Sequence, residues 1–409
     1  MQDFADIRKN GYYYVDKTAL VYEMTHTSKF YFMSRPRRFG KSLLISTLQC
    51  YFEGRKELFT GLAMERLETE WKKYPVLHVS FAVTKYTDLK TLQITLNEKL
   101  SKWERAYGIP NTSENEWGNR FANVIDAAYE KTGVEPVVLV DEYDAPLLDT
   151  IDNPDLQQTL KQEMRKFFSP LKDRSGHLRF VFLTGITKFS QLSIFSELNN
   201  LKVITMLDKY APICGITEEE LLEQMKPEIQ ALADSNGLGY EEACAALKQQ
   251  YDGYHFSEKS PDVYNPYSLI NALSDGNLAS YWFSTGTPTI LTKLIAKYDM
   301  NPVDFEAGFP ATLGMFDTPA ETAIDPIPML YQSGYLTIKN FEDGEYILGF
   351  PNDEVKFGFL KILLPCYASK IVSQNDIFLL KFTRALKESR ISDAMNLMRA
   401  FLSSIPYFQ

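Results

Sequence analysis

The clearest pattern along the chain is an alternation of short, wholly apolar runs with longer segments that repeat apolar residues at helical spacing. Runs rich in β-branched, aliphatic and aromatic residues are typical of strands buried on both faces of a parallel sheet. The runs cover residues 29–34, 76–81, 136–140, 179–183 and 203–206, and the helical segments between them cover 43–52, 91–107, 117–131 and 155–171. This order predicts an α/β fold with a doubly wound, mostly parallel sheet.

The first apolar run ends in a basic turn that carries a glycine, a lysine and a serine in succession. Gly40 can adopt a backbone conformation that a Cβ forbids, and Lys41 can reach the β- and γ-phosphates of a nucleotide. The hydroxyl of Ser42 can bind Mg²⁺, and the helix that follows adds the positive end of its dipole. The stretch therefore predicts the phosphate-binding loop of a P-loop NTPase. The alternative interpretation is a basic surface turn before an ordinary helix.

The loop departs from the general pattern G-x-x-x-x-G-K-S/T at its first position, where the chain has Arg35. Pro36 follows it and offers no N–H group. We therefore expect backbone N–H groups from about Arg38 to Ser42 to hold the anion, with Arg37 or Arg38 supplying additional charge. The residues expected to contact the nucleotide are Arg37, Arg38, Phe39, Gly40, Lys41, Ser42 and Leu43.

A second candidate segment follows the apolar run 136–140, which ends in two carboxylates. Parallel strands present their carboxyl ends at one edge of the sheet, so Asp141 is expected to share a Mg²⁺ ion with Ser42. Glu142 is expected to orient and deprotonate the attacking water. Asp144 has two interpretations, a residue near the metal or a cap of the helix that begins at residue 145, and we favour the cap.

The apolar run 179–183 ends at Thr184, on a strand that we expect beside the acidic one. In NTPases of this kind, a polar side chain at the end of that strand often senses the γ-phosphate. Thr184 fits this role, and Thr187 and Lys188 are its rivals. An ordinary threonine at the end of a strand is the alternative interpretation.

The chain divides into four predicted regions. Residues 1–212 form the ATPase domain, 213–324 a helical lid region, 325–350 a winged-helix-like unit and 351–409 a helical connector toward a missing C-terminal domain. Aromatic clusters at 251–256, 264–269 and 281–286 lack interleaved basic residues, so core packing explains them better than base stacking. Acidic residues at the turn 342–345 disfavour contact between the winged-helix-like unit and DNA phosphates.

Composition narrows the class of protein. The chain has 409 residues and a formal net charge of −10, so it should repel nucleic acid except through a local basic surface. Its four cysteines and four histidines lack the spacing of a disulfide framework or a zinc site. With no leader and no apolar run of about 18 residues, we expect a cytoplasmic protein that does not enter a membrane. Tyrosines at 12–14 could stack on adenine, but core packing is the commoner role.

Five stretches together resemble one family: YVDKT at 14–18, SRPRRFGKS at 34–42, VDEYD at 140–144, TGITKFS at 184–190 and FPNDEV at 350–355. They are similar to the bacterial AAA-ATPase-like proteins, which usually carry a PD-(D/E)xK nuclease-like domain at the C-terminus. The resemblance covers nearly the whole chain and makes the absent first glycine a trait of the family. It implies an ATPase of the additional-strand class, with the nuclease-like domain beginning about where this chain stops. Asp353, Glu354 and Lys356 are too close in sequence to form that nuclease site.

The predicted function is Mg²⁺-dependent ATP binding and hydrolysis, acting as a nucleotide-gated switch for an attached or partner effector domain. The alternative is a non-hydrolysing regulatory or DNA-tethering module that uses the winged-helix-like unit. Two kinds of partner stay open: further copies of this chain in a homo-oligomer, and a nucleic acid bound through the missing domain. The sequence has no Asp-bearing motif for guanine recognition, which slightly favours ATP over GTP as the nucleotide. Arg165, Arg174 and Arg179 are candidate arginine fingers by location alone.

Overall fold

The computed structural model describes residues 2–110, 116–187, 201–282, 304–316, 318, 325–368 and 372–402. Its centre is a five-stranded sheet with the order β2-β3-β4-β1-β5, in which all neighbouring strands are parallel. The strands are β1 (Phe30–Ser34), β2 (Val76–Ser80), β3 (Val137–Asp141), β4 (Phe180–Gly185) and β5 (Lys202–Val203). The α/β fold with a parallel sheet, predicted from the apolar runs, is confirmed.

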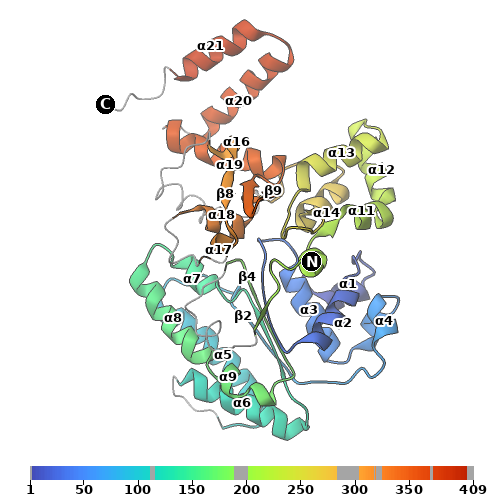
Figure 1. Cartoon of the computed structure of the whole chain (residues 1–409), viewed down its shortest axis with the longest axis vertical. Helices are drawn as coiled ribbons and strands as arrows, with labels where there is room; N and C mark the ends of the chain where they lie inside the picture. Colours follow the sequence, from blue (N-terminus) through green and yellow to red (C-terminus); the bar gives the residue numbers. More distant parts are fainter. Residues whose placement is uncertain are drawn as a thin grey trace.

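Helices cover both faces of the sheet, which explains why its central strands are apolar until their carboxyl ends. Every residue of β1, β3 and β4 is buried. Figure 1 shows α1 to α4 on one side of the sheet and α5, α6, α8 and α9 on the other.

The helices of the first side are α1 (Phe4–Lys9), α2 (Thr18–Thr27), α3 (Lys41–Phe52) and α4 (Ala63–Leu67), with a short 3₁₀ turn, η1 (Lys56–Phe59). Between residues 89 and 213 the helices are α5 (Leu89–Tyr107), α6 (Trp117–Thr132), α7 (Ala145–Asp149), α8 (Pro154–Phe168) and α9 (Pro170–Asp173), with η2 (Ser175–His177) and η3 (Asp208–Ile213).

The carboxyl ends of β1, β3 and β4 meet at one edge of the sheet. Ser34 of β1 pairs with Gly185 of β4, and Val140 of β3 pairs with Leu183. The strand order reverses beside β1. From β1 the chain crosses to β2 at the far edge of the sheet, returns through β3 and β4, and then adds β5 on the other side of β1. Ligands of open α/β sheets bind at the carboxyl edge where the order reverses.

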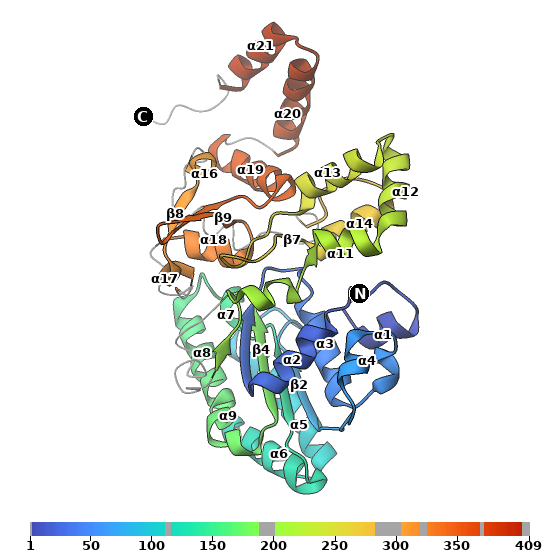
Figure 2. The ribbon, with the colours of Figure 1, turned by 45° about the vertical axis from the view of Figure 1, so that its right-hand side comes forward.

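The chain beyond residue 215 forms a second group of elements, which Figure 2 shows above the sheet. Residues between 216 and 273 have an apolar core of their own, to which Ile229, Leu247 and Leu269 contribute. The elements are β6 (Ile216–Thr217), α11 (Glu218–Gln224), α12 (Lys226–Asn236), α13 (Tyr240–Tyr251), β7 (Val263–Tyr264) and α14 (Pro266–Asp275), with β6 and β7 paired antiparallel. Whether this part acts as a lid stays a prediction.

A small antiparallel sheet with the order β8-β10-β9 follows. Its hairpin turn places Asp343 and Gly344 at φ +53° and +86°, as a two-residue turn of this type requires. The elements are α16 (Asp304–Ala307), β8 (Phe309–Ala311), α17 (Leu313–Phe316), α18 (Ile327–Ser333), β9 (Thr337–Glu342) and β10 (Glu345–Gly349). The expected helix and hairpin are present, whereas β8 was not predicted. The winged-helix role stays a prediction.

The last described elements are α19 (Asp353–Ala368), α20 (Val372–Lys387) and α21 (Ile391–Leu402). Helix α19 packs beside the small sheet, and α20 and α21 form a hairpin that projects away from the rest of the structure (Figure 2). Within the described ranges, every helix is too short or too polar to cross a membrane.

A buried ion pair that joins α5 to α6 leads to a prediction about stability. Arg120 donates to both carboxylate oxygens of Glu104, at 2.7 and 2.8 Å, and both side chains are almost fully buried. Loss of one member leaves the other charge buried and unpaired, so Glu104→Ala should lower the free energy of unfolding by about 3 kcal/mol. The matched control Glu98→Ala, exposed on the same helix, should change it by less than about 1 kcal/mol. Chemical denaturation measures both, and equal losses would contradict the prediction.

Candidate functional site

The loop between β1 and α3 contains two residues in the left-handed region of backbone space. Gly40, the cap residue of α3, has φ +87°, and Arg38 has φ +68°. Glycine adopts this conformation without steric cost, but Arg38 carries a Cβ and is strained by roughly 1 kcal/mol or more. Surrounding contacts must therefore hold Arg38 in place. The first N–H groups of α3 have no intrahelical acceptor, as at every helix start.

The ammonium group of Lys41 is buried between this loop and the acidic strand. Lys41 is 4% exposed, and its Nζ donates to the carbonyls of Arg35 and Pro36, at 3.0 Å each. Burial lowers the pKa of Lys41, while the carboxylates at the end of β3, above all Glu142, favour the charged form. The loop and the end of β3 therefore face each other across the edge of the sheet.

Asp141, Ser42 and Thr184 place oxygen atoms at this same edge. Burial raises the pKa of Asp141, and the neighbouring Ser42 hydroxyl and the charge of Lys41 act against that shift. Thr184 is fully buried at the end of β4, the neighbour of β3. In the described part of the chain, Asp141 Oδ1 and Thr184 Oγ1 have no hydrogen-bond partner, although both atoms are buried. Carboxylate and hydroxyl oxygens suit Mg²⁺, so these groups fit a phosphate-bound cation.

Glu142 turns the chain sharply where β3 ends. Its φ is +49°, which is uncommon for a residue with a Cβ. Its side chain is half-buried, and its charge acts directly on Lys41. Strained backbone of this kind is concentrated at functional sites, where the surrounding structure holds it in place.

Asp144 stands at the N-cap position of α7, as expected from the sequence, but its side chain makes no capping hydrogen bond. Its carboxylate turns to the segment after β4, where Oδ2 accepts from the N–H groups of Ile186 at 2.9 Å and Thr187 at 2.7 Å. The Thr187 hydroxyl donates to the same oxygen at 3.0 Å. Asp144 and Thr187 thus tie the exit of β3 to the exit of β4, beside Thr184. Lys188 lies outside the described residues.

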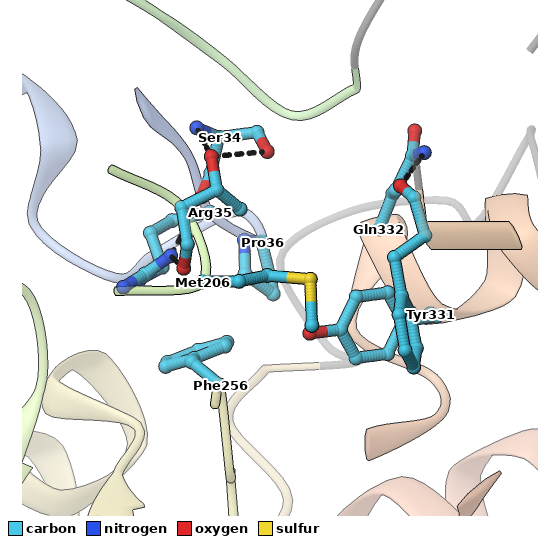
Figure 3. Close-up of a pocket in the computed structure, with 9 residues that line it drawn as sticks. Ser34, Arg35, Pro36, Met206, Phe256, Tyr331 and Gln332 are labelled. Carbon is cyan, nitrogen blue, oxygen red and sulfur yellow. Dashed lines mark hydrogen bonds between the residues drawn. The ribbon is translucent and has the colours of Figure 1, made fainter. Parts of the chain in front are cut away.

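Arg35 is buried at the position where the general pattern has its first glycine. Figure 3 shows its guanidinium group over the ring of Phe256, and the distance to the ring centroid is 4.1 Å. It also donates to the carbonyls of Ser34 at 3.0 Å and Thr205 at 2.7 Å. The adjoining cavity has a volume of about 20 Å³, room for about one water molecule, so it is too small for a nucleotide. Arg35 therefore braces the loop.

The remaining loop residues differ in exposure. Arg37 and Arg38 have exposed side chains, and Leu43 is half-buried in the first turn of α3. Phe39 is fully buried, with its ring 4.6 Å from that of Tyr254. A ligand at the loop can therefore meet the backbone of Phe39 but not its ring.

A cavity of about 570 Å³ lies beside Gly40 and the first turns of α3. Its wall is mostly apolar and includes Leu43, Leu44, Ile213, Met225, Ile270 and Leu273. Tyr12, Tyr13 and Tyr14 all line it. Tyr12 and Tyr13 are 50% and 54% exposed, and the ring of Tyr14 also packs edge-on against that of Phe4, with 4.9 Å between ring centroids. All three tyrosines therefore border the cavity, and Tyr14 packs against the apolar core as well.

The chain matches a family model and a relative from a bacterium. The family model described as "Predicted AAA-ATPase" matches residues 1–195, which contain the loop, β3 and β4. The chain is also 34% identical over 416 residues to the uncharacterized protein in the vnfD 5′ region of Azotobacter chroococcum mcd 1. That match covers 100% of this chain and 77% of the relative. The chain belongs to the predicted AAA-ATPase family.

In this AAA-ATPase-like protein, two of the three candidate arginine fingers lie away from the loop. Arg174 and Arg179 precede β4, so they stand at the amino edge of the sheet, opposite Lys41. Arg174 pairs with Asp126 at 2.8 Å, and Arg179 donates to the carbonyl of Thr25 at 3.1 Å. Neither can reach a phosphate at the loop of the same chain.

One contact to the loop had no signal in the sequence. The indole N–H of Trp282 donates to the carbonyl of Arg37 at 3.2 Å, across 245 positions of the chain. The aromatic cluster at 281–286 was expected to pack in a core, and residues 283–286 lie outside the described part. Periodicity cannot reveal such a long-range contact, because it reports only on neighbours along the chain.

The buried carboxyl group of Asp144 leads to a prediction about pH. Burial raises its pKa from 3.8 to about 6, against the opposing effects of Thr187 and Lys41. The folded state therefore holds this proton more tightly than the unfolded state, and stability from this group is gained as pH falls through 6. Between pH 7 and pH 5, wild type should gain about 1 kcal/mol more stability than Asp144→Asn. Denaturant titrations at the two pH values test this, and the same pH dependence in both proteins would refute it.

Proposed function

We propose that the protein binds ATP together with Mg²⁺ at the loop 35–42 and hydrolyses it. The observation that carries this proposal is the meeting of Lys41, Ser42 and Asp141 at one buried edge of the sheet. The buried oxygens of Asp141 and Thr184 support it, because a cation and a phosphate would supply the partners that they lack. Membership of the predicted AAA-ATPase family is consistent with this activity.

Each group at this edge has a proposed role. Lys41 would stabilise the negative charge of the β- and γ-phosphates, and Ser42 and Asp141 would hold Mg²⁺, which neutralises phosphate charge when bound. Glu142 would orient the attacking water and accept its proton. Thr184 would hydrogen-bond to the γ-phosphate and so distinguish ATP from ADP.

Backbone N–H groups from Arg38 to Leu43, at the start of α3, would complete the phosphate site. Gly40 gives this stretch its left-handed turn. Arg37 and Arg38, whose side chains are exposed, would add positive charge at its rim, where the guanidinium group of Arg38 lies over the ring of Tyr267.

The cavity beside Gly40 would hold the nucleoside. Its apolar wall and its tyrosines suit the faces of a flat aromatic base, and it begins where α3 begins. Its volume of about 570 Å³ lies within the range of small-molecule sites.

We further propose that the nucleotide state acts on an attached or partner effector domain, because residues beyond 250 cover the outer side of the loop. A DNA-tethering role receives less support, since Glu342, Asp343 and Glu345 surround the turn between β9 and β10 and would repel phosphates. A non-hydrolysing module would bind ATP without turnover, and the following measurements separate the two functions.

Removing the charge of Lys41 should mainly weaken binding, whereas removing the charge of Glu142 should mainly slow turnover. Lys41→Ala should weaken Mg²⁺–ATP binding by about 10- to 100-fold, because it removes charge-assisted contacts to phosphate. Glu142→Gln should bind Mg²⁺–ATP nearly as well as wild type but lower kcat by about 10²- to 10⁴-fold, because it removes the base. Calorimetric titration and phosphate release measure the two effects.

Two exposed residues provide matched controls, Lys90→Ala on α5 and Glu130→Gln on α6. Both should leave binding and turnover at the wild-type level. Equal turnover in wild type, Lys41→Ala and Glu142→Gln would refute the site. Tight ATP binding by wild type without phosphate release would favour the non-hydrolysing module.

The nucleoside cavity can be tested apart from the phosphate site. Ile270→Glu places a carboxylate on the apolar wall and should weaken ATP binding by about tenfold, because the base cannot compensate for burying that charge. The affinity for the Mg²⁺ complex of inorganic tripolyphosphate should not change, since that ligand occupies only the phosphate site. The matched control is Ile94→Glu, an isoleucine of similar exposure on α5. Equal losses for both ligands would show that the cavity does not bind the nucleoside.

A further inference from the structure

The outer face of the loop 35–39 is in contact with the part of the chain beyond residue 250. The contacts are Arg35 over the ring of Phe256 (4.1 Å), Arg38 over the ring of Tyr267 (4.6 Å), the rings of Phe39 and Tyr254 (4.6 Å) and the Arg37 carbonyl with the indole N–H of Trp282 (3.2 Å). Three of these contacts involve loop side chains. The contact with Trp282 is different, because it is a hydrogen bond to the loop backbone.

This hydrogen bond fixes the orientation of one peptide group. A trans peptide is planar, and its carbonyl and its N–H point in opposite directions. When the Arg37 carbonyl faces Trp282, the N–H of Arg38 must face away from it, toward the inner side of the loop. Arg38 is also the strained residue of the loop, with φ +68°. Trp282 thus holds the peptide group at which a strained conformation begins.

Trp282 is itself held by a buried carboxylate. Oε1 of Glu354 accepts from the backbone N–H groups of Tyr281 at 2.5 Å and Trp282 at 2.8 Å. Glu354 is 1% exposed and lies in the first turn of α19, and Trp282 is 9% exposed. The ring of Trp282 also packs against Tyr335, with 5.3 Å between ring centroids. A continuous set of contacts therefore runs from α19 to the loop backbone.

We propose that Trp282 and Glu354 are positioning residues for nucleotide binding. Glu354 fixes the backbone of Trp282, and the indole N–H of Trp282 fixes the peptide between Arg37 and Arg38, so that the following N–H groups face the phosphates. The inference rests on the proposed function, because it assigns phosphates to this loop. It also makes the start of α19 a support for the proposed phosphate site, acting through Trp282.

Four variants separate positioning from general stability. Trp282→Phe keeps an aromatic ring but removes the N–H, and Glu354→Ala removes the acceptor. Glu354→Gln keeps a carbonyl oxygen at the same place and should restore the function lost in Glu354→Ala. Trp117→Phe is the matched control, because the buried Trp117 donates its indole N–H to Glu163 at 2.7 Å, on helices away from the loop.

The first measurement is the affinity of the full chain for Mg²⁺–ATP. Trp282→Phe and Glu354→Ala should each weaken binding by about three- to tenfold, the effect of one hydrogen bond. The double variant that combines Trp282→Phe with Glu354→Ala should bind no more weakly than Trp282→Phe alone, because Glu354 acts through Trp282. Trp117→Phe should bind like wild type. Wild-type affinity in Trp282→Phe would overturn the proposal.

The second measurement needs no nucleotide and decides the proposal even if ATP is not the ligand. Hydrogen exchange of the peptide that covers residues 35–44 should be faster in Trp282→Phe and Glu354→Ala than in wild type, Glu354→Gln and Trp117→Phe. Unchanged exchange in Trp282→Phe would overturn the positioning role. Failure of wild type to bind Mg²⁺–ATP would refute the proposed function, while the exchange rates would still test the link between α19 and the loop.

Discussion

The structure depends on the burial of one positive charge, the ammonium group of Lys41. A buried ammonium is stable only when acceptors and opposite charges surround it. The carbonyls of Arg35 and Pro36 supply the acceptors, and the carboxylates that follow β3 supply the charge. The loop and the acidic strand must therefore stay together. Strand β4 pairs with both β1 and β3 and aligns their carboxyl ends at the same edge of the sheet.

The balance of charge around Lys41 limits what can bind there. One buried ammonium faces the carboxyl groups of Asp141, Glu142 and Asp144, so a bare polyphosphate would meet net repulsion. A polyphosphate that carries a divalent cation does not, because the cation can bind carboxylate oxygen. The raised pKa of Asp144 reduces the repulsion further as pH approaches 6. The electrostatics of the site are thus consistent with the proposed complex of a nucleotide and Mg²⁺.

The sequence was sufficient to predict the parallel sheet and which residues lie at its carboxyl edge. Apolar runs report burial on both faces, and the geometry of parallel strands then brings Ser42, Asp141 and Thr184 to the same side. Asp144 shows where this reasoning fails, because a carboxylate before a short helix can cap the helix or accept from the next strand. Local sequence does not distinguish these outcomes. In the structure, the N–H groups of Ile186 and Thr187, which follow β4, donate to the carboxylate of Asp144. The pairing of β8 with β10 and the cavity beside Tyr12 and Tyr13 also arise only when distant segments meet.

The missing first glycine shows why the loop could not be understood from its own residues. A glycine-rich loop can turn its N–H groups inward at little steric cost, because its backbone is permissive. Here Pro36 provides no N–H and Arg38 is strained, so the conformation needs support from outside the loop. Phe256, Tyr254 and Trp282 give that support from more than 200 positions away along the chain. The geometry of the proposed phosphate-binding loop is therefore a property of the assembled fold, and a change beyond residue 250 can alter it without touching the loop sequence.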